Sequence, residues 1–292
     1  MNIILCGSPF ESEKAKYVQH LIKKLEEHAS FIAVEHQFHD FLIDNIKFNK
    51  EIKIFETIEE LDLSIDFILS IGGDGTLLNT TSLIGYKGIP ILGINTGRLG
   101  FISSVSTDQI DNAINQLIHK KYNIENRTLL ELETTKKLFG EKNFALNEIT
   151  ILKKDTSSMI RIHAFLDNEF LNSYWADGLI ISTPTGSTGY SLSCGGPIVI
   201  PGTENFIITP IAPHNLNVRP IIISEDKKIR LKVEDRDELA LVALDSRSRA
   251  FDPTIELNIK KAKFKAKIIR LNSQTFISTI REKLMWGKDK RN

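Results

Sequence analysis

One short stretch constrains the fold of this 292-residue chain more than any other: the turn over residues 72–76, which reads Gly-Gly-Asp-Gly-Thr. The apolar segment Phe67–Ile71 directly before it has the length and β-branched content of a buried parallel strand. After it, Leu77, Leu78 and Ile84 are spaced as on one face of a helix. The sequence therefore predicts a strand, a tight turn and a helix start in direct succession.

This turn has the composition of a phosphate-binding site. Its glycines let the backbone approach an anion, and the start of a helix offers unpaired N–H groups. Asp74 is unexpected there, because a carboxylate repels a phosphate. We expect Asp74 either to hold a metal ion or to accept a proton from a nucleophile, and both roles suit phosphoryl transfer. The alternative is a purely structural turn, since Gly and Asp both tolerate positive φ.

Length and charge narrow the class of protein. A chain of 292 residues exceeds the usual size of one domain, so we expect two. Lys and Arg together number 37, as do Asp and Glu, and this balance argues against nucleic-acid binding. The two cysteines form no metal-binding spacing, and no apolar run reaches membrane-spanning length. With no signal peptide recognisable at its start, the sequence favours a cytoplasmic protein.

Strand-like and helix-like segments alternate over residues 1–103 and predict a doubly wound, Rossmann-like α/β domain. Helices are expected from Glu11 to Glu27 and from Thr107 to Lys120, and one or two strands between Phe31 and Phe55. Residues 104–274 carry closely spaced strand-like runs, including separate ones over 254–259 and 264–271, and predict a mainly β, sandwich-like domain. Residues 275–292 predict a closing helix that completes the first domain.

A second glycine-rich stretch spans residues 176–197 and is dense in hydroxyl groups. A simple surface turn needs far fewer Ser and Thr residues, and apolar strands bracket this one. Backbone N–H groups and hydroxyls suit a polar ligand, and Tyr190 can stack on a base. A third polar element, Asn147-Glu148, lies within an apolar segment and is suited to ribose hydroxyls.

Together these three motifs resemble the NAD kinase family over most of the chain. The glycine–aspartate turn alone is weak, since diacylglycerol kinases and 6-phosphofructokinases carry similar turns. The order and spacing of the other two are specific. The resemblance implies transfer of the γ-phosphate of ATP to the 2′-hydroxyl of the adenosine ribose of NAD, giving NADP and ADP. It also implies a divalent metal ion, usually Mg²⁺, and a homodimer or homotetramer. We assign no side chain of this chain to the metal ion.

The resemblance assigns roles residue by residue. Asp74 is similar to the catalytic acid near the 2′-hydroxyl, and we favour a general base over a metal organiser. Gly72, Gly73 and Thr76 resemble the phosphate loop. The positions that the resemblance assigns to NAD binding are Gly75, Asn147, Glu148, Asp177, Thr188, Tyr190, Ser193 and Asp245.

Two other readings remain at this point. A lipid or sphingoid-base kinase shares the domain plan and the glycine–aspartate turn, but its acceptor site should be apolar rather than rich in hydroxyls. A module that senses NAD(P)(H) without turnover would keep the binding loops and tolerate loss of Asp74, which is present here.

Overall fold

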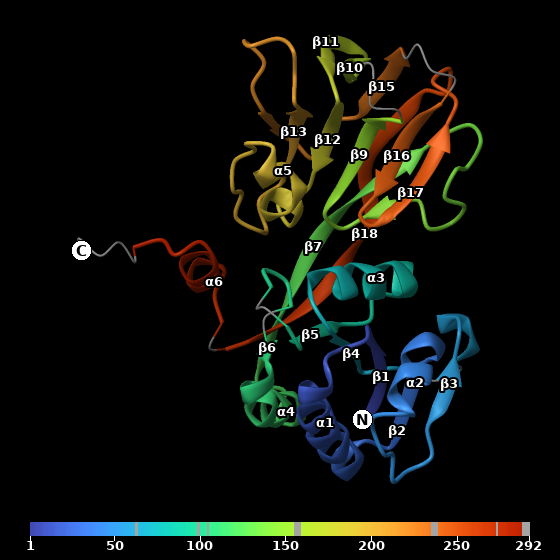
Figure 1. Cartoon of the computed structure of the whole chain (residues 1–292), viewed down its shortest axis with the longest axis vertical. Helices are drawn as coiled ribbons and strands as arrows, with labels where there is room; N and C mark the ends of the chain where they lie inside the picture. The colour runs from blue at the N-terminus through green and yellow to red at the C-terminus, as the bar shows by residue number, and fades with distance from the viewer. Residues whose placement is uncertain are drawn as a thin grey trace. The chain divides into compact units, whose positions relative to one another are not determined.

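The computed structural model describes residues 1–61, 64–97, 100–103, 105–154, 159–234, 239–272 and 274–287. Two compact units make up the chain, the first from Met1–Asn126 with Ala266–Asn292 and the second from Arg127–Lys265. Figure 1 labels the helices and strands of both. Strands β7 (Tyr122–Glu133) and β18 (Leu257–Leu271) each contain one of the two points where the chain passes from one unit to the other.

The first unit is built on a parallel sheet with the strand order β5-β4-β1-β2-β3. Its strands are β1 (Asn2–Gly7), β2 (Phe31–Glu35), β3 (Lys53–Phe55), β4 (Phe67–Ile71) and β5 (Ile91–Asn95), with the short β6 (Val105–Ser106) beside β5. The order reverses at β1, which has β2 on one side and β4 on the other. A doubly wound sheet binds its ligands at such a reversal, outside the carboxyl ends of the strands.

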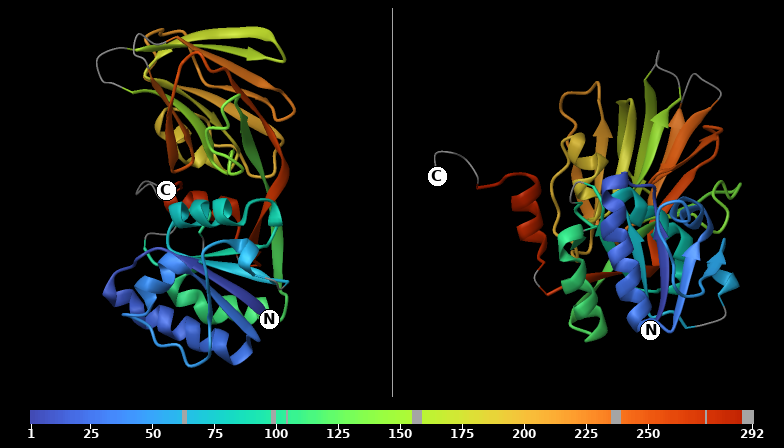
Figure 2. Two further views of the ribbon diagram at one scale, coloured as in Figure 1. Left: turned by 90° about the vertical axis from the view of Figure 1, so that its right-hand side faces the viewer. Right: turned by 60° about the horizontal axis from the view of Figure 1, so that its bottom comes forward.

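Helices cover both faces of this sheet. They are α1 (Ala15–His28), α2 (His36–Leu42), α3 (Asp74–Ile84) and α4 (Ile110–Ile118). A further helix, α6 (Phe276–Lys283), belongs to the same unit. Figure 2 shows α3 on one face and α1 and α4 together on the other. The second face holds the main core of the unit, where Leu21, Leu69 and Ile114 are buried.

The unit boundary lies after residue 126 rather than after the expected residue 103. The reason is α4, whose apolar face packs against α1 and joins the core of the first unit. The helices expected from Glu11 and from Thr107 are present as α1 and α4. The sequence missed α2, whose first turn is capped when the Glu35 carboxylate accepts hydrogen bonds from Gln37 N and Phe38 N.

The second unit is mainly antiparallel β-structure, as predicted. One sheet has the order β14-β13-β12-β9-β16-β17, and a second contains β11-β10-β15-β18. Their strands are β8 (Phe144–Ala145), β9 (Glu148–Lys153), β10 (Ile160–Leu166), β11 (Glu169–Ala176), β12 (Gly178–Ser182), β13 (Asn205–Ile211), β14 (Ile221–Ser224), β15 (Ile229–Glu234), β16 (Ala240–Leu244) and β17 (Arg247–Phe251). Alternate residues of both sheets, such as Ile151 and Ile162, share one core, which makes the unit a sandwich.

Some details of the second unit differ from expectation. Strands β11, β13 and β17 were not predicted, and the two runs over 254–259 and 264–271 are parts of the single strand β18. The alternation of buried and exposed residues shifts by one residue at 260 and 261, which are both half-buried, but the strand continues through them without a turn. No helix in the described parts of the chain is long and apolar enough to cross a membrane.

Candidate active site

The predicted glycine turn joins β4 to α3 in the first unit. Gly72 has φ +150°, and a Cβ there would lie 2.3 Å from Thr76 Oγ1 and 2.7 Å from Ser8 Oγ. Those two hydroxyl oxygens are 2.8 Å apart and hydrogen-bonded. Only glycine satisfies both the backbone conformation and this space. A Cβ on Gly73 or Gly75 would meet nothing within 4 Å, so the space beside both residues is open.

Asp74 is the first residue of α3, and its carboxylate is held by a neighbouring loop. Its Oδ2 accepts a hydrogen bond from Phe101 N at 2.7 Å, while Oδ1 accepts from Ile102 N at 3.1 Å and from Ser103 N at 2.8 Å. A carboxylate offers about four lone-pair positions, so about one remains for a further donor. The arrangement fixes the orientation of Asp74 and leaves it able to accept one more proton or hydrogen bond.

A pocket of about 680 Å³ lies at the carboxyl ends of β1, β4 and β5. It is lined by polar residues such as Ser8, Lys14 and Thr96, and by Gly73 and Gly97. This position matches the reversal of strand order at β1. Lys14 and Glu11 supply one charge of each sign and Ser8 supplies a hydroxyl, so the lining is suited to a polar ligand.

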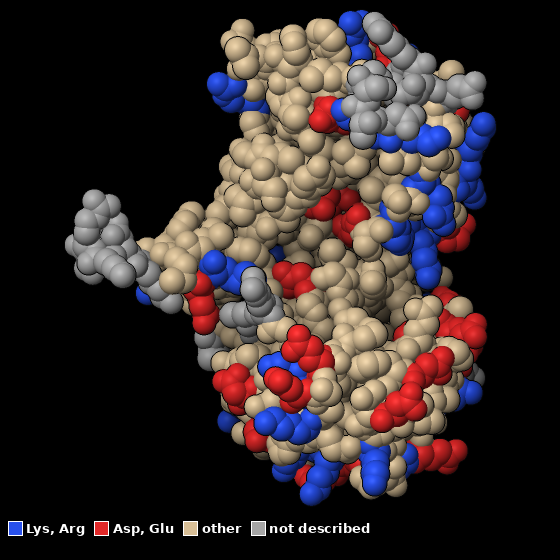
Figure 3. All heavy atoms as spheres, viewed as in Figure 1, with Lys and Arg blue, Asp and Glu red and all other residues tan. Residues whose placement is uncertain are grey.

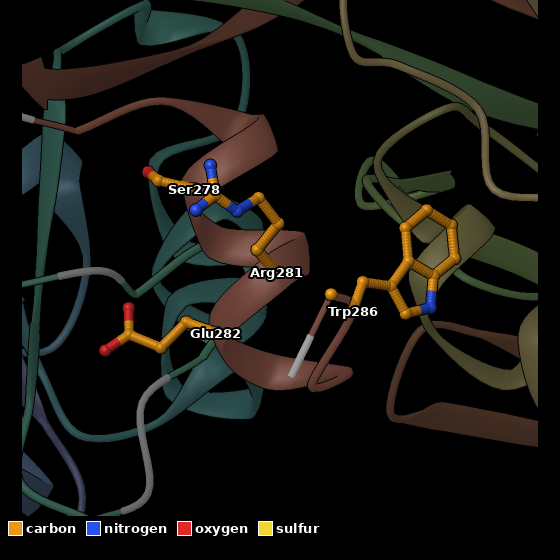
Figure 4. Close-up of a pocket in the computed structure, with 5 residues that line it drawn as sticks. Ser278, Arg281, Glu282 and Trp286 are labelled. Atoms are coloured by element: carbon orange, nitrogen blue, oxygen red, sulfur yellow. The ribbon is translucent and has the colours of Figure 1, made fainter. Parts of the chain in front are cut away.

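A second pocket in the same unit contains no predicted site residue. It is lined by Ser278, Arg281 and Glu282 of α6 and by Trp286 and Gly287 beyond the helix end. Figure 4 shows the side chains of Ser278 and Arg281 next to one another, with Glu282 directed elsewhere.

In the second unit, the predicted pair Asn147-Glu148 meets Asp245. The Asp245 carboxylate accepts from three successive backbone amides: Oδ2 from Leu146 N at 2.9 Å, and Oδ1 from Asn147 N at 2.7 Å and Glu148 N at 3.1 Å. Asp245 itself has φ +52°, in the turn between β16 and β17. The sequence matched Asp245 to a ligand-binding position, and in the structure its carboxylate holds the backbone of Leu146, Asn147 and Glu148.

Two polar atoms of this segment point to a ligand. Asn147 Oδ1 and Glu148 Oε2 are shielded from solvent, yet neither has a hydrogen-bond partner among the described residues. A buried polar atom without a partner costs about 1–3 kcal/mol, so such atoms in a native protein need a reason. Binding of a polar molecule that supplies the missing partners is such a reason.

Burial also shifts the charges here. Burial, reinforced by the nearby Asp245 carboxylate, raises the pKa of Glu148 to about 8. Burial raises the pKa of Asp245 too, although its three amide donors and Arg247 act in the opposite direction. At neutral pH Glu148 is therefore mostly protonated and presents one donor and one acceptor.

Arg247 holds the same segment from its other side. Its guanidinium donates to the carbonyls of Lys142, at 2.5 Å, and of Phe144. Lys and Arg side chains gather near β16 and β17 on the face shown in Figure 3. The segment that carries Asn147 and Glu148 is thus fixed through its amides by Asp245 and through nearby carbonyls by Arg247.

The hydroxyl-rich stretch folds back onto the same segment. Thr183 N donates to Asn147 O at 2.9 Å, and Thr183 Oγ1 donates to Leu146 O at 2.6 Å. A Cβ on Gly186 would lie 2.1 Å from Asn147 O, so this close approach requires glycine. Several of its hydroxyls therefore build the loop rather than face a ligand, as Ser187 Oγ shows by donating to Pro184 O at 2.7 Å.

The remaining predicted residues lie in or near this loop. Tyr190 begins the short helix α5 (Tyr190–Ser193) and its side chain is 41% exposed. Burial, Cys194 and Asp177 raise its pKa, which places Tyr190 near Asp177. Asp177 pairs with Lys153 Nζ at 2.6 Å, and Ser193 is exposed. Thr188 Oγ1 donates to Thr185 O at 3.3 Å.

Both halves of the chain match models of one family. Residues 3–122 match the ATP-NAD kinase N-terminal domain, and residues 146–271 match the ATP-NAD kinase C-terminal domain. The chain belongs to the NAD kinase family. Asp74 lies within the first match, and Asn147, Glu148 and Asp245 lie within the second.

Individual NAD kinases agree over the full length. The chain is 47% identical to the NAD kinase of Cytophaga hutchinsonii over 293 residues, covering 100% of both chains. It is 44% identical to an NAD kinase of Bacteroides fragilis over 291 residues, again covering 100% of both. The family resemblance inferred from the motifs is confirmed.

Solved structures agree with the fold. An NAD kinase from Archaeoglobus fulgidus, in complex with ATP, superposes with a TM-score of 0.75 at 28% identity over 98% of this chain and 99% of that one. A yeast NADH kinase in complex with NADH gives a TM-score of 0.87 at 24% identity over 99% and 89%, and it supports the fold alone.

Several residues of this NAD kinase site were missed by sequence reasoning. They include Ser8, Gly100, Ser103, Thr183 and Arg247. Ser8 could have been found because it directly follows the first strand. Gly100 could have been found because it belongs to a glycine-containing segment after β5. Arg98 of the same segment, whose guanidinium is of a type that binds phosphate, lies outside the described residues.

Proposed function

We propose that this member of the NAD kinase family, which phosphorylates NAD to NADP with ATP, uses Asp74 to accept the proton of the 2′-hydroxyl. The new bond forms between the 2′-oxygen and the γ-phosphorus, the bond from that phosphorus to the β,γ-bridging oxygen breaks, and ADP leaves. The observation that carries this proposal is the fixed Asp74 carboxylate with about one free lone pair. A ribose hydroxyl is a poor nucleophile at neutral pH, so a positioned acceptor accelerates its attack.

The phosphates of ATP fit the pocket beside the glycine turn. Its Gly73 edge is open to a ligand, and Lys14 and Ser8 supply a positive charge and a hydroxyl. The N-terminus of α3 adds backbone donors and a partial positive charge. These groups stabilise charge that develops on the transferred phosphoryl group without moving during the reaction.

The adenosine part of NAD fits the second unit's polar segment. Asn147 Oδ1 and Glu148 Oε2 need partners, and the vicinal hydroxyls of a ribose supply them. A mostly protonated Glu148 both donates to and accepts from such a diol. The exposed ring of Tyr190 suits stacking on adenine, and Asp177, Thr188 and Ser193 lie in or near the same loop.

A divalent metal ion, Mg²⁺ in the first instance, belongs to this proposal as an ion that accompanies ATP. The described residues contain no group of three or more His, Cys, Asp or Glu side chains that holds a metal. Mg²⁺ usually binds through substrate phosphates, waters and one or two carboxylates rather than a full protein cage. The donor set therefore fits Mg²⁺ brought by the nucleotide, which then neutralises charge on the phosphates.

The test of the function is NADP formation. We expect the purified protein with ATP, Mg²⁺ and NAD to produce NADP, detected by coupling to an NADP-specific dehydrogenase. Calorimetric binding of NAD or NADPH with no turnover would instead favour a sensing module. Phosphorylation of a sphingoid base or diacylglycerol, with none of NAD, would favour a lipid kinase.

Location and assembly form part of the same proposal. The described cysteines, Cys6 and Cys194, form no disulfide, which suits a cytoplasmic protein. We infer a homodimer or homotetramer from family membership, and light scattering of the purified protein measures it.

A further inference from the structure

Arg270 lies near the end of β18 in the first unit, and its side chain is almost fully removed from solvent at 7% exposure. Its Nε donates to Glu125 Oε2 at 3.1 Å. Its two terminal nitrogens donate to backbone carbonyls, Nη1 to Ile102 O at 3.3 Å and Nη2 to Phe101 O at 3.1 Å. A buried guanidinium that binds adjacent carbonyls fixes the loop to which they belong.

That loop is the one that holds Asp74. The amides of Phe101 and Ile102 donate to the Asp74 carboxylate, and the carbonyls of the same two residues accept from Arg270. The negative carboxylate meets the N–H groups and the positive guanidinium meets the C=O groups. The Arg270 guanidinium therefore stabilises the peptide orientation in which the N–H groups point at Asp74. The Asp74 carboxylate likewise stabilises the orientation in which the C=O groups point at Arg270.

We propose that Arg270 is a positioning residue for catalysis: it sets the loop that aims the Asp74 carboxylate. This inference rests on the proposed role of Asp74 as the proton acceptor. Glu125 orients the guanidinium from its remaining side. Lys283 of α6 adds a contact, with its Nζ 5.4 Å from the centre of the Phe101 ring.

The guanidinium geometry matters in this arrangement. Arg presents its donors in a rigid planar fork, which reaches two carbonyls and a carboxylate at once. Lys carries the same charge at a single point and cannot reproduce the fork. Arg270→Lys thus keeps the charge and loses the geometry, whereas Arg270→Gln loses both.

The experiment compares kinetics and stability in four variants. Arg270→Lys and Arg270→Gln change the proposed residue, and Glu125→Ala removes its orienting partner. Arg230→Gln is the control, because Arg230 is also partly buried, packs 4.0 Å from the Phe165 ring centre and pairs with Glu256 at 3.8 Å in the second unit. For each variant we would measure kcat, KM for NAD and ATP, the melting temperature and hydrogen exchange of the amides of residues 101–103.

A misaimed catalytic group lowers turnover by up to about 100-fold without changing substrate binding. We expect kcat to fall by about 10- to 100-fold in Arg270→Lys and further in Arg270→Gln, with both KM values within about threefold of the wild type. Glu125→Ala should lower kcat by several-fold. Amide exchange should accelerate at 101–103 in these variants, whereas Arg230→Gln should change only the melting temperature.

Two results would overturn the inference. One is a folded Arg270→Lys protein with wild-type kcat. The other is a loss of kcat that follows the melting temperature as it does in Arg230→Gln. If the Arg270 variants do not fold, an unchanged kcat in folded Glu125→Ala overturns it. A wild-type protein that forms no NADP would instead refute the proposed function itself.

Discussion

Two carboxylates in different units bind the backbone in the same way. Asp74 takes the amide of Phe101 on Oδ2 and those of the next two residues on Oδ1. Asp245 takes the amide of Leu146 on Oδ2 and those of the next two residues on Oδ1. An arginine binds carbonyls close by in each case: Arg270 those of Phe101 and Ile102 themselves, and Arg247 those of Lys142 and Phe144, which precede Leu146.

Their surroundings differ, and the difference separates two tasks. Asp74 lies at the start of a helix beside glycines that leave open space, so its last lone pair is available to a substrate. Asp245 lies in a tight turn next to Glu148, whose pKa is raised by burial and by Asp245. We therefore expect the first motif to present a reactive carboxylate and the second to present the backbone and side chains of its neighbours.

Replacing each aspartate by asparagine gives the largest expected contrast. In each variant the Asn side-chain oxygen can still accept from the two amides that Oδ1 binds in the wild type. Its NH₂ group replaces Oδ2 and cannot accept from the third amide, so both variants lose the hydrogen bond to Oδ2. We expect Asp74→Asn to lower kcat by about 10³-fold or more, because it also removes the proton acceptor. Asp245→Asn should mainly raise the KM for NAD, by about tenfold. Steady-state kinetics on the two proteins measure both effects.

Calorimetry adds the control for this pair. NAD should bind Asp74→Asn within a few-fold of its wild-type affinity. Equal losses of kcat in the two variants would show that Asp74, like Asp245, only holds backbone.

A smaller loss of kcat is expected when Gly100, the glycine next to the Asp74 carboxylate, is replaced. A Cβ on Gly100 would lie 1.8 Å from Asp74 Oδ1, so Gly100→Ala must displace the carboxylate. We expect kcat to fall by about 100-fold, as displacement of a reacting group by about 1 Å does. Gly97→Ala is the comparison in the same segment: its Cβ would come no closer than 3.8 Å to any neighbour, Asn95 Oδ1, and because Gly97 lines the pocket proposed for ATP, we expect its effect on the KM for ATP and not on kcat. A loss as large in Gly97→Ala would place the effect in the segment's backbone rather than in Asp74.

The smallest expected effect concerns pH and Glu148. Folded Glu148 keeps its proton to about pH 8, whereas the ordinary pKa is 4.5. Between these values the folded state binds more protons than the unfolded state, so the free energy of unfolding falls as pH rises. Glu148→Gln removes this dependence, so its stability relative to the wild type should rise progressively from about pH 5 to about pH 8. Urea unfolding across this range measures the difference.

Glu26→Gln should behave in the opposite way. Burial raises the pKa of Glu26, but hydrogen bonds from Asn49 and Lys50 outweigh it and the net pKa is lowered. The wild-type contribution of Glu26 is therefore present at neutral pH and lost in acid. A wild-type pH dependence that persists in Glu148→Gln would contradict the raised pKa.

Much of the fold and part of the site follow from local sequence. The run before Gly72 and the glycines after it predict a strand, a turn and a helix start, and α3 begins at Asp74. The expected strand over residues 160–166 matches β10. Helix α2 was missed because its burial depends on only two apolar side chains, Phe38 and Leu42. β13 was missed because Thr209 and Pro210 interrupt its apolar run, although the structure buries both in the sheet.

Sequence by itself determined the family and the glycine turn, and it singled out Asp74 and the Asn147-Glu148 pair as candidates, because each depends on residue types at short spacing. Only the tertiary structure decided what holds these groups. Hydrogen-bond partners lie far apart in the sequence: Asp74 and the Phe101 amide by 27 residues, Asp245 and the Asn147 amide by 98, and Arg270 and the Phe101 carbonyl by 169. Such partners are set by sheet register and by how loops fold onto strand ends, and a peptide N–H or C=O is present at almost every residue. Residue type therefore cannot mark which amides and carbonyls a charged side chain will bind.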